Sequence, residues 1–224
     1  MTSDAGRAAA GPETTEAGPY RLDELSWIEL ADWFRRDPRL LLPVGSCIQH
    51  GEFLPLGTDS RITSRLAHDV CRRTGILLAP LLPYGVATEE DLEYAGTAGM
   101  ARKTLHRVLN ELVQSWERQG LAEITLLTTN VNPRNIQALA MVMGETLRVR
   151  SIDTRAIDVR RAVDSSVDHT GTDEISLMLH LAPDLVRNGP AAAGFPAGAT
   201  ATKGRQLYEH LLDSIVGRLG AKDV

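Results

Sequence analysis

The segment Arg39–Asp59, RLLLPVGSCIQHGEFLPLGTD, holds in order the three elements on which the predicted fold depends. Its apolar start, Arg39–Gly45, is typical of a buried strand that proline and glycine close. A polar loop rich in glycine and proline follows, and Asp59 stands where a helical pattern begins. A strand that runs directly into such a loop is typical of α/β sheets, in which ligands bind beyond the carboxyl ends of the strands.

The same order of strand, polar loop and helix recurs along the rest of the chain. Further apolar strands are predicted over residues 76–85, 123–129 and 148–158. Helices are predicted over residues 25–33, 59–73, 104–119, 176–187 and 204–219, with one more from Pro133 that turns Ile136, Ala140, Met143 and Leu147 inward. Alternating strands and helices favour a mostly parallel sheet covered on both faces. The predicted fold class is therefore α/β, a three-layer α/β/α sandwich.

Composition narrows the domain organisation and the class of partner. Residues 1–19 are mostly Ala, Gly, Thr, Glu and Pro and are predicted to form a disordered tail, with residues 20–224 as a single domain. The net charge of -5 argues against a nucleic-acid surface. No apolar run approaches the ~18 residues of a membrane span. The two cysteines, Cys47 and Cys71, form no CxxC pair, which favours a cytoplasmic protein.

Two clusters of polar residues are candidates for chemistry on spacing alone. His50 precedes Asp59 in a loop, and imidazole and carboxylate together suit a zinc or manganese ion. Equally, Asp59 can cap its helix while His50 bonds to the loop. In the second cluster, His169 and Glu174 can form an acid–base pair, or Asp173 or Glu174 can cap the next helix. Spacing does not separate these interpretations.

Five motifs, in the family's order, make the sequence similar to the creatininase (creatinine amidohydrolase) family. The first, LPVGSCIQHGEFLPLGTD (42–59), resembles the family pattern PvGsxEqHGpHLPLgtD. The others are PYGVATEEDLEYAGT (83–97), TTNVNPRNIQAL (128–139), DHTGTDEISLML (168–179) and ATKGRQLYEHLLD (201–213). Because these motifs cover most of the chain, the resemblance implies the family's fold and ancestry.

The resemblance implies a site for two divalent metals, of which this sequence keeps only part. His50 and Asp59 match the first-motif histidine and the bridging aspartate. Ile48 replaces the first-motif glutamate, and Asn132 replaces the histidine of the family's NgHGGN motif. Isoleucine offers no ligand and asparagine at best a neutral amide oxygen, so a two-metal site is not expected. The prediction is either one zinc or manganese ion on His50, Asp59 and Glu174, or no metal.

The other matched positions carry the predicted catalytic and substrate-binding roles. The family's catalytic histidine, and the glutamate five residues later, match His169 and Glu174. Arg134, at a helix start, either replaces the lost cation and binds a substrate carboxylate or phosphate, or points to solvent. Asn132 and Cys47 are predicted to bind the substrate with it. Cys47 is interpreted either as a nucleophile or as a packed residue at the end of a strand.

The predicted function follows from the resemblance and from these departures. The chain is predicted to be an enzyme that hydrolyses, or forms, an amide or other C–N bond of a small molecule. A non-catalytic binding or scaffold protein that has lost the metal chemistry is the alternative. The resemblance also implies a homo-oligomer, with the hexamer as a frequent form in the family.

Overall fold

The computed structural model describes residues 20–154, 157, 171–187 and 193–220. The predicted disordered tail, residues 1–19, lies outside the described residues, and so does His169. Within the described ranges, strands and α-helices alternate along the chain in the predicted order.

The strands form one parallel sheet in the order β2-β1-β3-β4. They are β1 (Arg39–Pro43), β2 (Leu77–Leu78), β3 (Glu123–Thr128) and β4 (Arg148–Asp153). Each predicted strand is present, but the second is much shorter than residues 76–85. Pro80 and Pro83 supply no N–H to a neighbouring strand, so regular pairing ends after Leu78.

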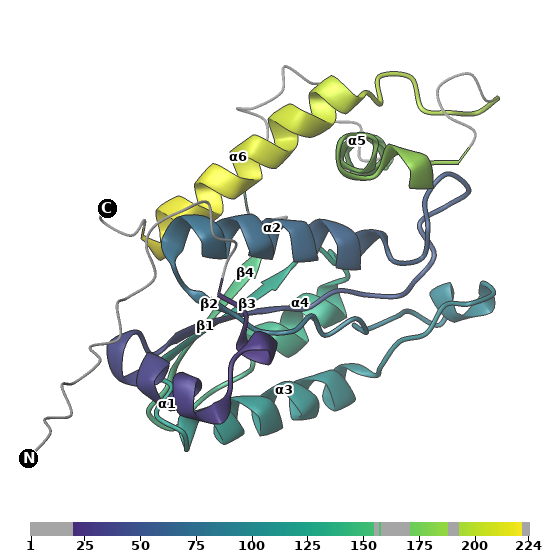
Figure 1. Ribbon diagram of the computed structural model, residues 1–224. Helices are drawn as coiled ribbons and strands as arrows, with labels where there is room; N and C mark the ends of the chain where they lie inside the picture. The colour runs from purple at the N-terminus through teal and green to yellow at the C-terminus, as the bar shows by residue number, and fades with distance from the viewer. Residues whose placement is uncertain (1–19, 155–156, 158–170, 188–192, 221–224) are drawn as a thin grey trace, which may run out of the picture.

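Helices cover both faces of this sheet, as Figure 1 shows. On one face lie α2 (Thr58–Thr74), α5 (Thr172–Leu181) and α6 (Ala201–Leu219). On the other face lie α1 (Trp27–Arg36), α3 (Arg102–Glu117) and α4 (Pro133–Ala140). The predicted three-layer α/β/α sandwich is confirmed.

Successive residues of the strands enter opposite cores, because side chains alternate across a sheet. Leu41 and Leu127 pack in the core formed with α2, α5 and α6. Leu40, Leu42 and Leu126 pack in the core formed with α1, α3 and α4. Burial on both faces explains why the strands are unbroken apolar runs in the sequence rather than alternating patterns.

The inward face predicted from Pro133 is correct at Leu147, which is 5% exposed, but wrong at Ala140 and Met143. The helix ends at Ala140, which is exposed, so Met143 lies beyond it and is 74% exposed. The buried side chains of α4 are instead Asn135, Ala138 and Leu139. The oxygen of Asn135 accepts a hydrogen bond from the main-chain N–H of Val86 at 3.0 Å. A polar residue therefore fixes the rotation of α4, where the apolar period alone predicted a different face.

The fifth helix also differs from its predicted range of residues 176–187. α5 begins at Thr172 and ends at Leu181, and the 3-10 helix Pro183–Leu185 (η5) follows it. Pro183 has no N–H and cannot continue an α-helix. The earlier start places Glu174 in the first turn of α5.

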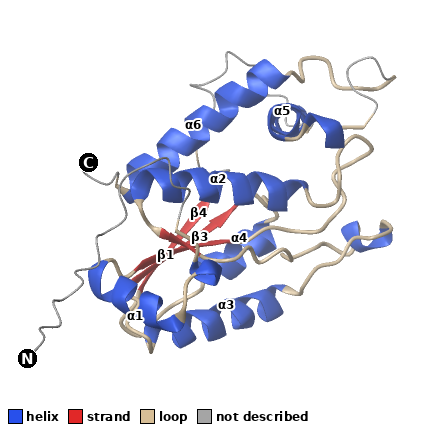
Figure 2. Cartoon of the chain, viewed as in Figure 1, coloured by secondary structure: helices blue, strands red, loops and turns tan. Residues whose placement is uncertain are grey.

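The long loops that leave the sheet lie at the carboxyl ends of the strands (Figure 2). One loop joins β1 to α2, and another joins β3 to α4. Residues 84–100 extend away from the sheet and carry the 3-10 helix Asp91–Glu93 (η2). A further 3-10 helix, Leu22–Glu24 (η1), precedes α1. The carboxyl edge is where ligands bind in sheets of this kind.

None of the described helices is both long enough and apolar enough to cross a bilayer.

Candidate functional site

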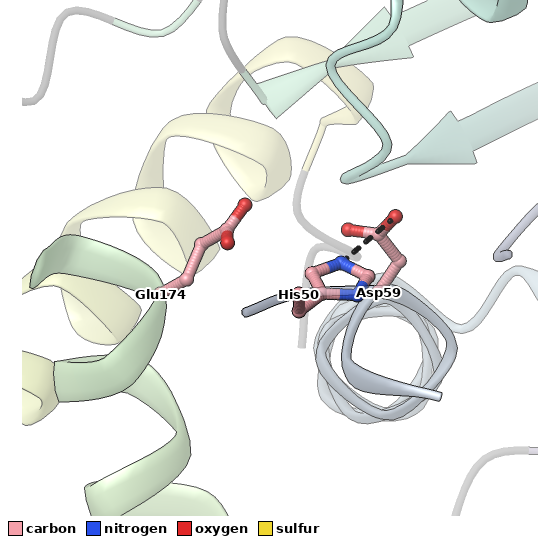
Figure 3. A group of neighbouring side chains, drawn as sticks. All are labelled: His50, Asp59 and Glu174. Atoms are coloured by element: carbon pink, nitrogen blue, oxygen red, sulfur yellow. Dashed lines mark ion pairs between the residues drawn. The ribbon is translucent and has the colours of Figure 1, made fainter. Parts of the chain in front are cut away.

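Three side chains with metal-ligand chemistry converge at the carboxyl edge of the sheet. They are His50 in the loop after β1, Asp59 in the first turn of α2 and Glu174 in the first turn of α5. One ligand atom of each lies within 4.8 Å of those of the other two. Figure 3 shows Glu174 facing the His50–Asp59 pair across a gap. Among the described residues, no other group of three or more His, Cys, Asp or Glu side chains has this geometry.

The imidazole of His50 is held in one orientation by its own loop. Its Nδ1 lies 2.9 Å from the carbonyl oxygen of Ile48. A carbonyl oxygen only accepts, so Nδ1 carries the hydrogen and donates it. The other nitrogen, Nε2, lies 3.5 Å from Oδ2 of Asp59. This arrangement is the one in which a metal-binding histidine is usually found, with one ring nitrogen fixed by a carbonyl and the other available as ligand.

The carboxylate of Asp59 is held by two hydroxyl groups that the sequence analysis missed. Ser46 Oγ donates to Oδ2 of Asp59 at 2.6 Å. Thr129 Oγ1 lies 3.1 Å from the main-chain oxygen of Asp59 and 3.4 Å from its Oδ1. No side-chain hydrogen bond caps α2, whose N-cap residue is Gly57. The interpretation of Asp59 as a helix cap is therefore wrong, and its carboxylate faces the other two ligands.

The cluster combines two carboxyl groups with one imidazole. Burial opposes the charged form of His50, but the hydrogen bond to Asp59 and the negative charges of Asp59 and Glu174 outweigh it and raise the pKa of His50 to about 9. Burial also raises the pKa of the Glu174 carboxyl, and the neighbouring carboxylates of Asp59 and Asp173 act in the same direction.

The donor set fits one divalent ion. One imidazole nitrogen and two carboxylate oxygens are ligands that zinc and manganese accept, and zinc sites of catalytic type commonly have three protein ligands. The two other positions that resemble family ligands do not add to it. Ile48 is apolar, and the side-chain oxygen of Asn132 accepts the main-chain N–H of Arg134 at 2.9 Å.

A cavity of about 640 Å³ opens beside this cluster. Its wall is formed by the loop after β1, the loop after β3, the start of α5 and part of the extended segment 84–100. Apolar residues make up much of that wall: Ile48, Phe53, Leu54, Val131, Ile175 and Pro196. Its acidic residues are Glu52, Asp59, Asp91 and Glu174, and its described lining contains no Lys or Arg. The volume lies within the usual range for small-molecule sites.

The remaining predicted site residues lie in different places. Asn132 lines the cavity, and its substrate-binding role stays a prediction. Arg134 and Cys47 are not among the residues of the wall. Arg134 is exposed, and within the described residues no ion pair joins its guanidinium to Asp59 or Glu174. Cys47 is half-buried, with Sγ 3.9 Å from the carbonyl oxygen of Gly96.

The structure confirms neither the role predicted for Arg134 nor the pair predicted for His169 and Glu174. Within the part of the chain that the structure describes, Arg134 makes no contact that would support its guanidinium in the place of the lost cation. That role stays a prediction. The acid–base pair of His169 and Glu174 also stays a prediction, because His169 lies outside the described residues.

Comparison with known proteins relates this chain to one family. The creatininase profile, described as "Creatinine amidohydrolase", matches residues 23–195. The mycofactocin precursor peptide peptidase of Mycobacterium ulcerans (strain Agy99) is 29% identical over 221 residues, covering 81% of this chain and 84% of that protein. The creatinine amidohydrolase of Pseudomonas putida is 26% identical over 191 residues, covering 73% and 72%. A solved structure named "Creatininase Mn" has a TM-score of 0.74 at 20% identity, covering 89% and 97%.

Proposed function

Because the chain belongs to the creatininase family, we propose that it hydrolyses an amide or related C–N bond of a small molecule or short peptide. The observation that carries this proposal is the convergence of His50, Asp59 and Glu174 on one cavity. The relatives support the class of bond, since one is a peptidase and another a creatinine amidohydrolase. Both activities cleave a C–N bond next to a carbonyl group.

We propose that His50, Asp59 and Glu174 hold one divalent ion, zinc or manganese. His50 contributes Nε2, because Nδ1 is bonded to Ile48, and each carboxylate contributes one oxygen. When bound, the ion would polarise the substrate carbonyl and acidify a water molecule. The name of the relative "Creatininase Mn" is consistent with a metal at this fold's site.

The protein's own groups have separate roles in the proposed reaction. Ser46 and Thr129 keep Asp59 in place, which fixes where the substrate carbonyl is polarised. Glu174 contributes one of its two carboxylate oxygens to the ion, and the other oxygen is proposed to accept the proton of the attacking water. As the water oxygen bonds to the carbonyl carbon and the C–N bond breaks, the proton passes to the departing nitrogen. The predicted role of His169 is to carry this proton to the departing nitrogen, with Glu174 orienting it.

The experiment that tests the function is a hydrolysis screen over cyclic amides and short peptides, with release of an amine as the signal. For a substrate found in that screen, Glu174→Gln is expected to lower kcat/KM by about a hundredfold or more, since a general base contributes about 10²–10⁴-fold. Glu111→Gln is the matched control, because Glu111 lies on α3, pairs with Arg107 at 2.8 Å and does not line the cavity. Full turnover by Glu174→Gln would exclude the proposed role.

A second candidate function is a binding protein without catalysis. Two observations favour it, both at positions that resemble metal ligands of the family. Ile48 is apolar, and the side-chain oxygen of Asn132 already accepts the main-chain N–H of Arg134. Metal-loaded protein that binds amides from the panel but releases no amine from any of them would support this candidate over the enzyme.

We also propose that the protein forms a homo-oligomer and works in the cytoplasm. Large apolar side chains on its surface, among them Trp27 at 79% exposure and Ile28 at 57%, support an interface with another chain. The two unpaired cysteines are compatible with a reducing compartment. Light scattering on the purified protein tests the oligomer, and a single-chain mass would contradict it.

A further inference from the structure

Part of the cavity wall next to the candidate metal site is apolar. Ile48 is only 8% exposed and lines the cavity two residues before His50, whose Nδ1 it fixes through its carbonyl. We propose that Ile48, with Phe53, Val131 and Ile175, forms a subsite for an apolar side chain of the substrate. This inference rests on the proposed function, because it names the substrate class of the same site.

The apolar residues come from elements that are firmly placed. Ile175 follows Glu174 in α5 and is 5% exposed. Phe53 is braced from behind, because its ring meets that of Phe195 edge-on at 5.2 Å and its carbonyl accepts the N–H of Arg187 at 2.8 Å. Such a wall exists before a ligand arrives, so a side chain that fits it binds without the cost of ordering the wall.

The size of the cavity leaves room for this subsite. A single ion with its ligands occupies only a small part of about 640 Å³. Ligand cavities of roughly 300–1,000 Å³ enclose whole small molecules and are mostly lined by apolar side chains. A substrate that places its C–N bond at His50, Asp59 and Glu174 therefore has space for a side chain against Ile48 and Val131.

The charges of the wall restrict the substrate further. One divalent ion balances the carboxylates of Asp59 and Glu174, but Glu52 and Asp91 remain in the same wall. The carboxylate of Asp91 is held in place by two hydrogen bonds: Gln49 donates to Oδ1 and Thr88 donates to Oδ2. With no Lys or Arg in the described lining, a substrate carboxylate near the scissile bond is repelled. The inferred class is a neutral amide that carries an apolar side chain.

Isothermal titration with three probes tests this inference without turnover. The probes are N-acetyl-leucinamide, N-acetyl-glycinamide, which lacks the side chain, and N-acetyl-leucine, which has a carboxylate in place of the amide. Measurements on EDTA-treated protein prevent metal-dependent hydrolysis, and zinc is then added back for comparison. The leucine amide is expected to bind roughly tenfold or more tighter than the glycine amide, because each apolar group in a fitted pocket has an effect of that order.

Two variants of the cavity wall test whether it causes the preference for the leucine amide over the glycine amide. Ile48→Ser is expected to reduce the leucine-to-glycine affinity ratio to about threefold or less, while Met143→Ser, an apolar-to-serine change at an exposed site away from the cavity, leaves it unchanged. Val131→Thr serves if Ile48→Ser does not fold, because Val131 is 43% exposed and the change keeps its shape. It is expected to narrow the ratio about twofold.

Three results would overturn the subsite: equal affinities for the two amides in the unmodified protein, no binding of any probe, or an unchanged ratio in both cavity variants. Failure of the hydrolysis screen would not affect this measurement. A selective protein that does not cleave amides would retain the subsite and lose the proposed enzymatic function.

Discussion

Two buried aspartates of α2 are held in different ways. Asp69, near the end of the helix, accepts hydrogen bonds from Tyr208 at 2.6 Å, from Arg65 at 3.0 Å and from His68 at 3.0 Å. Asp59, in its first turn, is held by hydroxyl groups and lies 3.5 Å from His50. Both side chains are almost fully buried, so burial alone does not separate their roles.

The difference lies in the balance of charge. Asp69 has a permanent cation, the guanidinium of Arg65, and its hydrogen bonds join α2 to α6. Asp59 has no Lys or Arg partner within the described residues and shares its surroundings with Glu174. A buried carboxylate paired with a permanent cation stabilises the fold, whereas one paired only with a titratable imidazole can take a metal ion in its place. We therefore interpret Asp69 as a structural residue and keep Asp59 as a proposed metal ligand.

The largest expected effect comes from neutralising the two aspartates in turn. Asp59→Asn removes an ionised ligand and is expected to lower kcat/KM by at least about a hundredfold, since even residues behind metal ligands cost 10–100-fold. Asp69→Asn keeps the same shape away from the cavity, and its kcat/KM is expected to stay within about twofold. Steady-state kinetics on a substrate from the amide screen measures both. Equal losses in the two variants would remove the distinction between the regions.

The next variant, Gly204→Ala, tests whether the position of Glu174 depends on the packing of α5 against α6. A Cβ atom on Gly204 would lie 1.8 Å from the carbonyl oxygen of Ser176. Gly204→Ala therefore has to separate the two helices, and overpacking of this kind costs about 2 kcal/mol of unfolding free energy. Because α5 carries Glu174, zinc affinity is expected to fall as well, although no ligand is changed.

Gly217→Ala is the control for that experiment. Gly217 lies in the same helix, and a Cβ there meets nothing within 4 Å. Alanine in an open helical position is expected to stabilise the protein by about 0.5–1 kcal/mol. Urea unfolding together with zinc titration checks both variants. Zinc affinity unaltered by Gly204→Ala would show that α5 tolerates the displacement.

A smaller effect is expected at the structural aspartate. Tyr208→Phe removes the hydroxyl that donates to Asp69 and leaves the ring in place. The unfolding free energy should fall by about 1.5 kcal/mol, because a buried hydrogen bond to a charged group is lost. Urea unfolding measures it, with unchanged zinc affinity as the second readout. A loss of zinc affinity as large as that of Asp59→Asn would contradict the separation of the two regions.

The smallest expected effect is the pH dependence of the stability that Asp69 contributes. Burial opposes its ionisation, but the hydrogen bonds from Tyr208, His68 and Arg65 outweigh burial and hold its pKa below the ordinary value of 3.8. A carboxyl with a depressed pKa stabilises the fold above its unfolded pKa, and this stabilisation is lost as the pH falls below about 4. The difference in thermal midpoint between the unmodified protein and Asp69→Asn should therefore shrink between about pH 6 and about pH 3. A constant difference would show that Asp69 stabilises by shape alone.

The parts of the site that lie close in sequence could be predicted from the sequence. His50 and Asp59 belong to one strand–loop–helix unit, so the fold brings them together at the carboxyl edge. Glu174 joins them only because α5 packs against α2 and α6, which no local pattern specifies; the resemblance to the family supplied it. Ser46 and Thr129 were missed because a single hydroxyl in a loop or at a strand end has no characteristic spacing.

Arg134 shows why the rest could not be predicted. The apolar period of residues 133–147 favours one face of α4, but Asn135 overrides it by bonding to Val86 N–H and Thr128 Oγ1. Successive helical residues point about 100° apart, so burial of Asn135 helps to turn Arg134 toward solvent. Hydrogen bonds to main-chain groups of another element decide this rotation, and hydropathy does not contain that information.

The most direct test of the one-ion site is to count bound metal after equilibrium dialysis against zinc or manganese. Mass spectrometry of the dialysed protein should find about one ion per chain in the unmodified protein and in Asp69→Asn, and none in Asp59→Asn. Two ions per chain, or one ion kept by Asp59→Asn, would contradict the assignment of His50, Asp59 and Glu174 as a single metal site.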